Sequence, residues 1–135
     1  MPLILWNQAL SVGIPSIDRQ HRQLVDIIND LHDAMLAGKA KDISGQILEK
    51  LLTYTRKHFA AEEAMMTAAN YTDLTAHQLR HRNLTRQVES YVLRYHRGEI
   101  TLNIHLMHFL RDWLTNHIQQ ADQDYRPAMQ ARGLQ

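Results

Sequence analysis

The sequence contains no cysteine, which excludes disulfide bonds, thiolate metal ligands and cysteine nucleophiles. Its 15 basic and 14 acidic residues nearly cancel, so no excess positive charge indicates a nucleic-acid-binding surface. No stretch approaches the roughly 20 apolar residues that span a bilayer. The apolar start MPLILWNQAL lacks a basic segment and a cleavage site, so we interpret it as a packed arm. We therefore expect a cytoplasmic protein without membrane insertion.

Proline and glycine are also scarce, and their positions indicate where helices end. The three prolines lie near the two ends of the chain, so no proline between residues 16 and 124 interrupts a helix. Gly38 and Gly98 suit the position just after a helix, and AANYTD (68–73) supplies a third break. We predict one domain over residues 1–135. Its four helices are expected at roughly 17–37, 43–68, 73–97 and 103–121.

Each predicted helix carries apolar residues three or four positions apart, which is typical of a helix with one buried face. Leu24, Ile28 and Leu31 form such a stripe in the first segment, and Leu106 and Leu110 begin one in the fourth. Because the connections are short, neighbouring helices should run antiparallel. The predicted fold is all-α: an up-down-up-down antiparallel four-helix bundle with an N-terminal arm.

Histidine is unusually frequent, with nine in 135 residues. Five histidines and one glutamate fall within the apolar stripes: His21, His58, Glu62, His77, His81 and His117. Burying so many polar groups without partners would cost about 1–3 kcal/mol each. A metal ion would satisfy them together, and without cysteine its ligands would be imidazole and carboxylate.

The positions of these residues along their helices support a common site. His21 and His77 lie near the start of their helices, whereas His58 and His117 lie near the end of theirs. In an up-down-up-down bundle all of these positions meet at one end. Asp122 follows His117 by five residues, about 140° around an ideal helix. It could join the site only through a loosened or π-type turn, and Asp124 competes with it on geometry alone.

The other histidines are expected to be bystanders. We predict that His32 is a hydrogen-bonded boundary residue and that His105 and His108 lie at the surface, while His96 lies near a helix C-terminus that favours its cation. A second group has no clear role in a site. It comprises Asp18 and Tyr125, which could contact ligands but are equally explained by capping and packing, and the arginines Arg80, Arg82 and Arg86, which indicate a solvated face.

Several motifs together resemble the hemerythrin family, specifically the single-domain prokaryotic bacteriohemerythrins. They are Trp6, VGIPSIDRQH (12–21), HFAAEE (58–63), HQLRH (77–81) and WLTNHIQQAD (113–122). The combined pattern of H, HxxxE, HxxxH and HxxxxD is highly specific, and the sequence matches it at every ligand position. The family handles oxygen, and the resemblance implies the same role for this chain.

The resemblance implies a non-haem di-iron centre with an oxo or hydroxo bridge. One iron would be held by His77, His81 and His117, and the other by His21 and His58. Glu62 and Asp122 would bridge both ions, and dioxygen would bind at the open position of the second. By family position an apolar pocket for dioxygen is lined by Leu24, Phe59, Trp113, Leu114 and Ile118. Within it, Leu114 is the best candidate for a gate.

The implied function is reversible binding of dioxygen, for storage or for delivery to an oxygen-requiring enzyme as partner. We expect a monomer without catalytic residues, which is therefore not an enzyme. Two alternatives stay open: an oxygen-sensing or redox-sensing regulatory module, and a di-iron enzyme acting on peroxide or nitric oxide. The ligand chemistry leaves the metal open as well, since histidine and carboxylate also suit zinc, manganese and cobalt.

Overall fold

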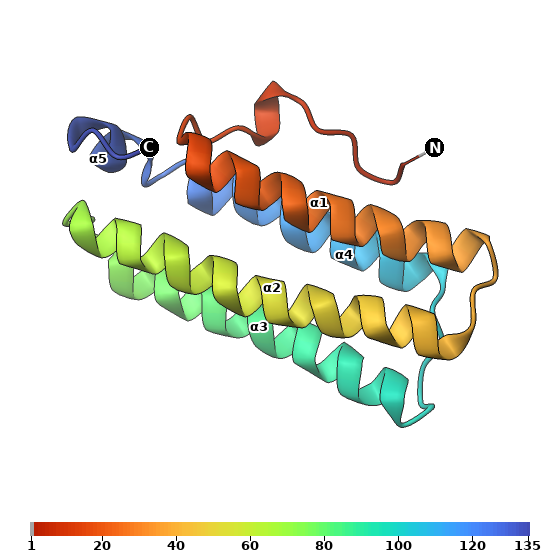
Figure 1. The fold of residues 1–135 in the computed structure, drawn as a ribbon. Coiled ribbons are helices and arrows are strands. Elements are labelled where there is room, and N and C mark those ends of the chain that lie inside the picture. Colours follow the sequence, from red (N-terminus) through yellow and green to blue (C-terminus); the bar gives the residue numbers. More distant parts are fainter. Residues whose placement is uncertain (1) are drawn as a thin grey trace.

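The computed structural model describes residues 2–135, and four long helices dominate it. They are α1 (Pro15–Leu36), α2 (Lys41–Ala68), α3 (Leu74–His96) and α4 (Ile104–His117). The helices run alternately up and down and pack side by side, with α1 against α2 and α4, and α2 against α3 (Figure 1). The predicted all-α antiparallel bundle is confirmed. Within residues 2–135, no helix has both the length and the apolar character needed to cross a membrane.

The turns between the helices use residues that tolerate a left-handed backbone. Gly38 is the second residue of the first connection, with a φ of 63°, and Gly98 is the second residue of the third, with a φ of 74°. The middle connection has Asn70 in this conformation, with a φ of 52°. Asn103 caps α4 by accepting a hydrogen bond from the backbone N–H of Leu106 at 3.0 Å. These short connections set the antiparallel order of the helices.

The N-terminal arm lies along α1, as Figure 1 shows. The side-chain amide of Asn29 bonds both backbone groups of Ile4, each at 2.9 Å. The guanidinium of Arg22 lies 4.8 Å from the ring centroid of Trp6. Asp18 holds the end of the arm, because its carboxylate accepts from the Ser11 hydroxyl at 2.6 Å and from the Val12 N–H at 2.8 Å. The arm is thus fixed where α1 begins.

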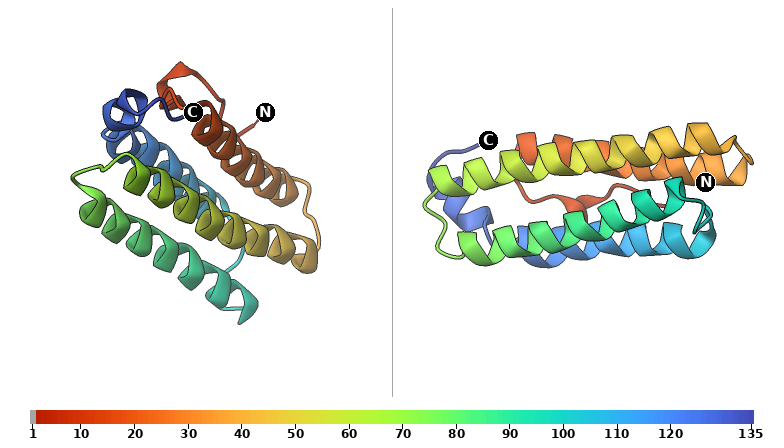
Figure 2. Two further views of the ribbon diagram at one scale, coloured as in Figure 1. Left: turned by 60° about the vertical axis from the view of Figure 1, so that its left-hand side comes forward. Right: turned by 90° about the horizontal axis from the view of Figure 1, so that it is seen from below.

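The chain after α4 contains two elements that complete one end of the bundle. The α-helix gives way to a π-helical segment, η2 (Ile118–Asp122), and a short helix α5 (Arg126–Ala131) follows. The C-terminus lies beside the start of α1, since the Ser16 N–H donates to the Gln135 carbonyl at 3.1 Å, whereas the N-terminal arm runs away from this end (Figure 2). Helix α5 was not among the predicted helices, although Pro127 in its first turn is a helix-start signal.

Removing the carboxylate that holds the arm should destabilise the protein. Asp18→Ala leaves the N–H of the fully buried Val12 without its partner, so the free energy of unfolding should fall by about 1–3 kcal/mol. Urea denaturation measures the change. Asp26→Ala is the matched control, because Asp26 is exposed on the same helix. Equal stability of the two variants would show that Asp18 does not anchor the arm.

Candidate metal centre

All seven residues predicted as metal ligands meet at one end of the bundle. Each of the four long helices supplies at least one of them, and η2 supplies the last. None is more than 8% exposed, and both carboxylates are fully buried. The side chains fall into two overlapping groups, within each of which the candidate ligand atoms lie within 4.8 Å of one another. The groups are Glu62, His77, His81, His117 and Asp122, and His21, His58 and Glu62.

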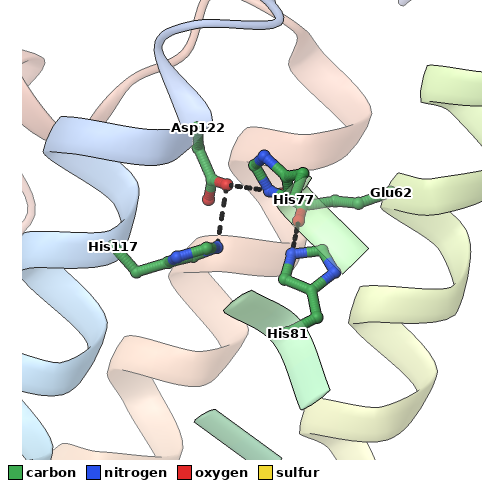
Figure 3. Close-up of side chains that lie close together, drawn as sticks. All are labelled: Glu62, His77, His81, His117 and Asp122. Carbon is green, nitrogen blue, oxygen red and sulfur yellow. Dashed lines mark ion pairs between the residues drawn. The ribbon is translucent and has the colours of Figure 1, made fainter. Parts of the chain in front are cut away.

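The larger group is arranged around the two carboxylates, as Figure 3 shows. The Nε2 atoms of His77 and His117 each lie 3.0 Å from Oδ1 of Asp122. The Nε2 atom of His81 lies 3.1 Å from Oε1 of Glu62. The three imidazoles from α3 and α4 therefore face one oxygen of Asp122 and one oxygen of Glu62.

The smaller group approaches the other oxygens of the same acids. The Nε2 atoms of His21 and His58 lie 3.1 and 3.2 Å from Oε2 of Glu62. His21 also lies 3.2 Å from Oδ2 of Asp122. Both carboxylates consequently present one oxygen to each group, an arrangement that suits bridging between two ions.

The π-helical segment explains how Asp122 reaches this site. In η2 the backbone is wound more loosely than an α-helix, which brings Asp122 to the same side as His117. The expected π-type turn is thus confirmed. The competing candidate, Asp124, is exposed and belongs to neither group.

The charges at the site are strongly coupled. Burial opposes ionisation of Glu62, but the attraction of His58 and the close contacts with three histidines hold its pKa well below the usual range. The pKa of Asp122 is also lowered, since His117 and His21 outweigh its burial and the repulsion from Glu62. Burial would lower the pKa of His21, yet the two carboxylates raise it to about 9. Without a metal, the anionic acids retain a proton on His21 that a cation would displace.

The unpaired atoms provide a test of whether a metal fits. The inward-facing Nε2 atoms of four histidines are buried without a hydrogen-bond partner, as are Oε1 of Glu62 and both oxygens of Asp122. Those histidines are His58, His77, His81 and His117. Neighbouring ligands at right angles, each about 2.1 Å from an ion, would be separated by roughly 3 Å, which matches the observed contacts. The donor set therefore fits metal ions better than a hydrogen-bonded network.

Three further side chains contact the outer side of the candidate ligands. The Nδ1–H of His58 donates to Gln20, and that of His81 donates to Glu63, if both rings are protonated at this nitrogen. The Tyr125 hydroxyl donates to Oε2 of Glu62 at 2.7 Å. Burial, followed by the charge of Glu62, raises the tyrosine pKa well above its ordinary value.

From the sequence the role of Tyr125 stayed open, and neither Gln20 nor Glu63 was predicted to contact the site. Gln20 precedes His21 directly, and Glu63 ends the HFAAEE motif, so their proximity to ligands in sequence was the available signal. Asp18, the other residue left open, holds the N-terminal arm through Ser11 and contacts none of the candidate ligands.

A narrow apolar gap borders the site and touches candidate ligands of both groups, namely His21, His58, His117 and Asp122. Three of the predicted pocket residues, Phe59, Trp113 and Leu114, line it, together with Leu84, which was not among the predicted residues. The gap is too narrow to admit a water molecule. Two other predicted pocket residues, Leu24 and Ile118, are fully buried, but the structure does not place them on this wall.

The remaining histidines lie away from the site. His105 and His108 are exposed, as expected, and His96 lies in the last turn of α3 with its Nε2 atom 2.8 Å from Glu49. His32 differs from the expectation, because its Nδ1 atom is buried without a hydrogen-bond partner. The apolar packing around α1 buries a ring nitrogen that its polarity would otherwise place at the boundary between core and solvent. The three clustered arginines, Arg80, Arg82 and Arg86, are exposed.

Comparisons with known proteins agree with this geometry. The sequence model for the hemerythrin HHE cation-binding domain matches residues 12–129. The bacteriohemerythrin of Pseudomonas aeruginosa is 38% identical over 129 residues, which cover 96% of this chain and 83% of that protein. That of Methylococcus capsulatus is 34% identical, with 97% and 100% covered. A crystal structure of wild-type hemerythrin superposes with a TM-score of 0.88 at 33% identity, covering 94% of this chain and 98% of that one. The chain therefore belongs to the hemerythrin family.

Proposed function

We propose that this protein binds two iron ions at the buried site and uses them to bind dioxygen reversibly. The observation that carries the proposal is the convergence of five imidazoles and two carboxylates around two overlapping centres. His77, His81 and His117 would hold one ion, and His21 and His58 the other. Glu62 and Asp122 would bridge them, because each directs one oxygen towards each group.

The described residues explain why binding would be favoured over further chemistry. Iron, when bound, supplies the electrons for reversible association with dioxygen. The site is bordered by an apolar wall of Phe59, Leu84, Trp113 and Leu114, which excludes water from the gap. Apart from the candidate ligands, the residues lining this gap carry no acid or base that could transfer a proton. This wall supports a role in oxygen storage or delivery.

The side chains that contact the ligands from outside would hold the site ready for metal. The Nδ1–H groups of His58 and His81 donate to Gln20 and Glu63, which leaves the Nε2 lone pairs directed inward. Tyr125 donates to Glu62 and fixes the orientation of this carboxylate. The two carboxylates bring two negative charges into a buried site, which offsets part of the charge of two metal cations.

Removing the metal should destabilise the bundle. At a free iron concentration about 100 times the dissociation constant, binding to the folded state alone contributes about 2.7 kcal/mol. We therefore expect anaerobic chelation of the reduced protein to lower its melting temperature, as measured by circular dichroism. His105→Ala should respond in the same way, because His105 is exposed, whereas His77→Ala should respond less. An identical melting temperature with and without metal would contradict a loaded site.

The side chain of Leu114 should protect the oxygenated protein from water. Leu114→Ala enlarges the apolar gap, so we expect water to enter and spontaneous oxidation to the diferric form to become several-fold faster. The decay of the oxygenated optical spectrum measures the rate. Leu110→Ala is the matched control, because Leu110 is buried one turn away but does not line the gap. Equal acceleration in both variants would assign the effect to general loosening of the bundle.

Oxygen cycling of the purified protein tests the proposed function. We expect two irons per chain and an optical spectrum that appears under oxygen and disappears when oxygen is removed, over repeated cycles. A colourless zinc protein, or irreversible oxidation in the first cycle, would contradict reversible oxygen binding.

A further inference from the structure

The two histidines that donate hydrogen bonds away from the site, His58 and His81, have partners of different charge. His81 Nδ1 lies 2.8 Å from Oε2 of Glu63, a carboxylate. His58 Nδ1 lies 2.6 Å from Oε1 of Gln20, a neutral amide. His81 belongs to the group with His77 and His117, whereas His58 belongs to the other group. The two candidate metal positions therefore differ in the charge placed behind their ligands.

The surroundings of Glu63 leave its charge directed at His81. The carboxylate is 27% exposed, but the His81 ring is only 2% exposed, so one of the contact partners is shielded from water. Three arginines line the same groove: Arg56 pairs with Glu89 at 3.3 Å, and Arg82 and Arg86 form no ion pair with Glu63. Within residues 2–135, His81 is the one basic side chain within ion-pair distance of Glu63.

The geometry also fixes the His81 ring in the plane that this contact needs. The Phe59 ring stacks on it with a centroid separation of 3.8 Å and an interplanar angle of 3°. With the Nδ1 proton donated to Glu63, the Nε2 lone pair faces Glu62 and the metal position. A carboxylate behind an imidazole raises its basicity as a metal ligand, and a neutral amide does so less.

We propose that Glu63 is a positioning residue that strengthens metal binding at the position of His77, His81 and His117, while Gln20 leaves the other position weaker. This inference rests on the proposed two-metal site. The two ions then bind in a set order: the first enters the three-histidine position, and the second enters beside His21 and His58. The position beside His21 and His58 is the one that loses its ion first.

Two substitutions change the charge behind a candidate ligand while keeping the shape of the side chain. Glu63→Gln removes a charge and keeps an oxygen that can accept from His81, whereas Gln20→Glu adds a charge behind His58 without changing the side-chain size. Because the three-histidine position also has more ligands, the order of binding alone does not identify the role of Glu63. The ratio of the two binding constants does identify it. Glu63→Gln should reduce this ratio by weakening the tighter step, and Gln20→Glu should reduce it by strengthening the weaker step.

The experiment titrates the metal-free full chain with Co²⁺ alone and follows heat and ligand-field absorption. In the wild type we expect two ions, with the first bound more tightly. Glu63→Gln should weaken the tighter step about tenfold, and Gln20→Glu should strengthen the weaker step by a similar factor. Glu89→Gln is the matched control, because Glu89 lines the same groove as Glu63 but pairs with Arg56. It should leave both steps unchanged.

Proton NMR at one equivalent of Co²⁺ shows which position is filled. Contact-shifted ring N–H signals arise only from histidines bound to the ion, so the wild type should show those of the three-histidine group. In a variant that carries both Glu63→Gln and Gln20→Glu, a second set of signals, from His21 and His58, should grow. Two ions bound with the same constants in wild type and Glu63→Gln would overturn this inference and leave the two-metal site intact. Fewer than two ions in the wild type would overturn both.

Discussion

The burial of two carboxylates among five imidazoles is the constraint on which the rest of this structure depends. Glu62 and Asp122 are fully buried and so bear the full cost of desolvation, which only opposite charge or metal coordination offsets. Without metal, the histidines do this in part, as the raised pKa of His21 indicates. The donor atoms left without partners show that hydrogen bonding among the seven residues is incomplete.

Several irregular features of the fold exist at this end and serve the same site. The π-helical turn brings Asp122 next to His117, and the chain beyond it returns so that Tyr125 reaches Glu62. The arm is held by Asp18 three residues before His21, where α1 begins. The opposite end has only short connections between regular helices. A site that must hold two ions in fixed positions thus lies where the bundle is best supported.

Much of the site could be predicted from sequence, because helical spacing and position along each helix act together. His58 and Glu62 share a helix face, and the antiparallel order brings His21 and His117 to the same level. The spacing to Asp122 even required a departure from α-helical geometry, which η2 shows. The outer partners could not be predicted in this way, because Gln20 and Glu63 lie outside the apolar stripes and resemble ordinary surface residues. The buried nitrogen of His32 depends on packing that no local pattern specifies.

The most direct test of the central claim locates the metal in the folded protein. An anomalous difference map, measured at the iron edge on crystals of the iron-loaded chain, should show two peaks. One should lie among His77, His81 and His117 and the other beside His21 and His58, with Glu62 and Asp122 contacting both. A single peak, or peaks remote from these seven side chains, would contradict the account.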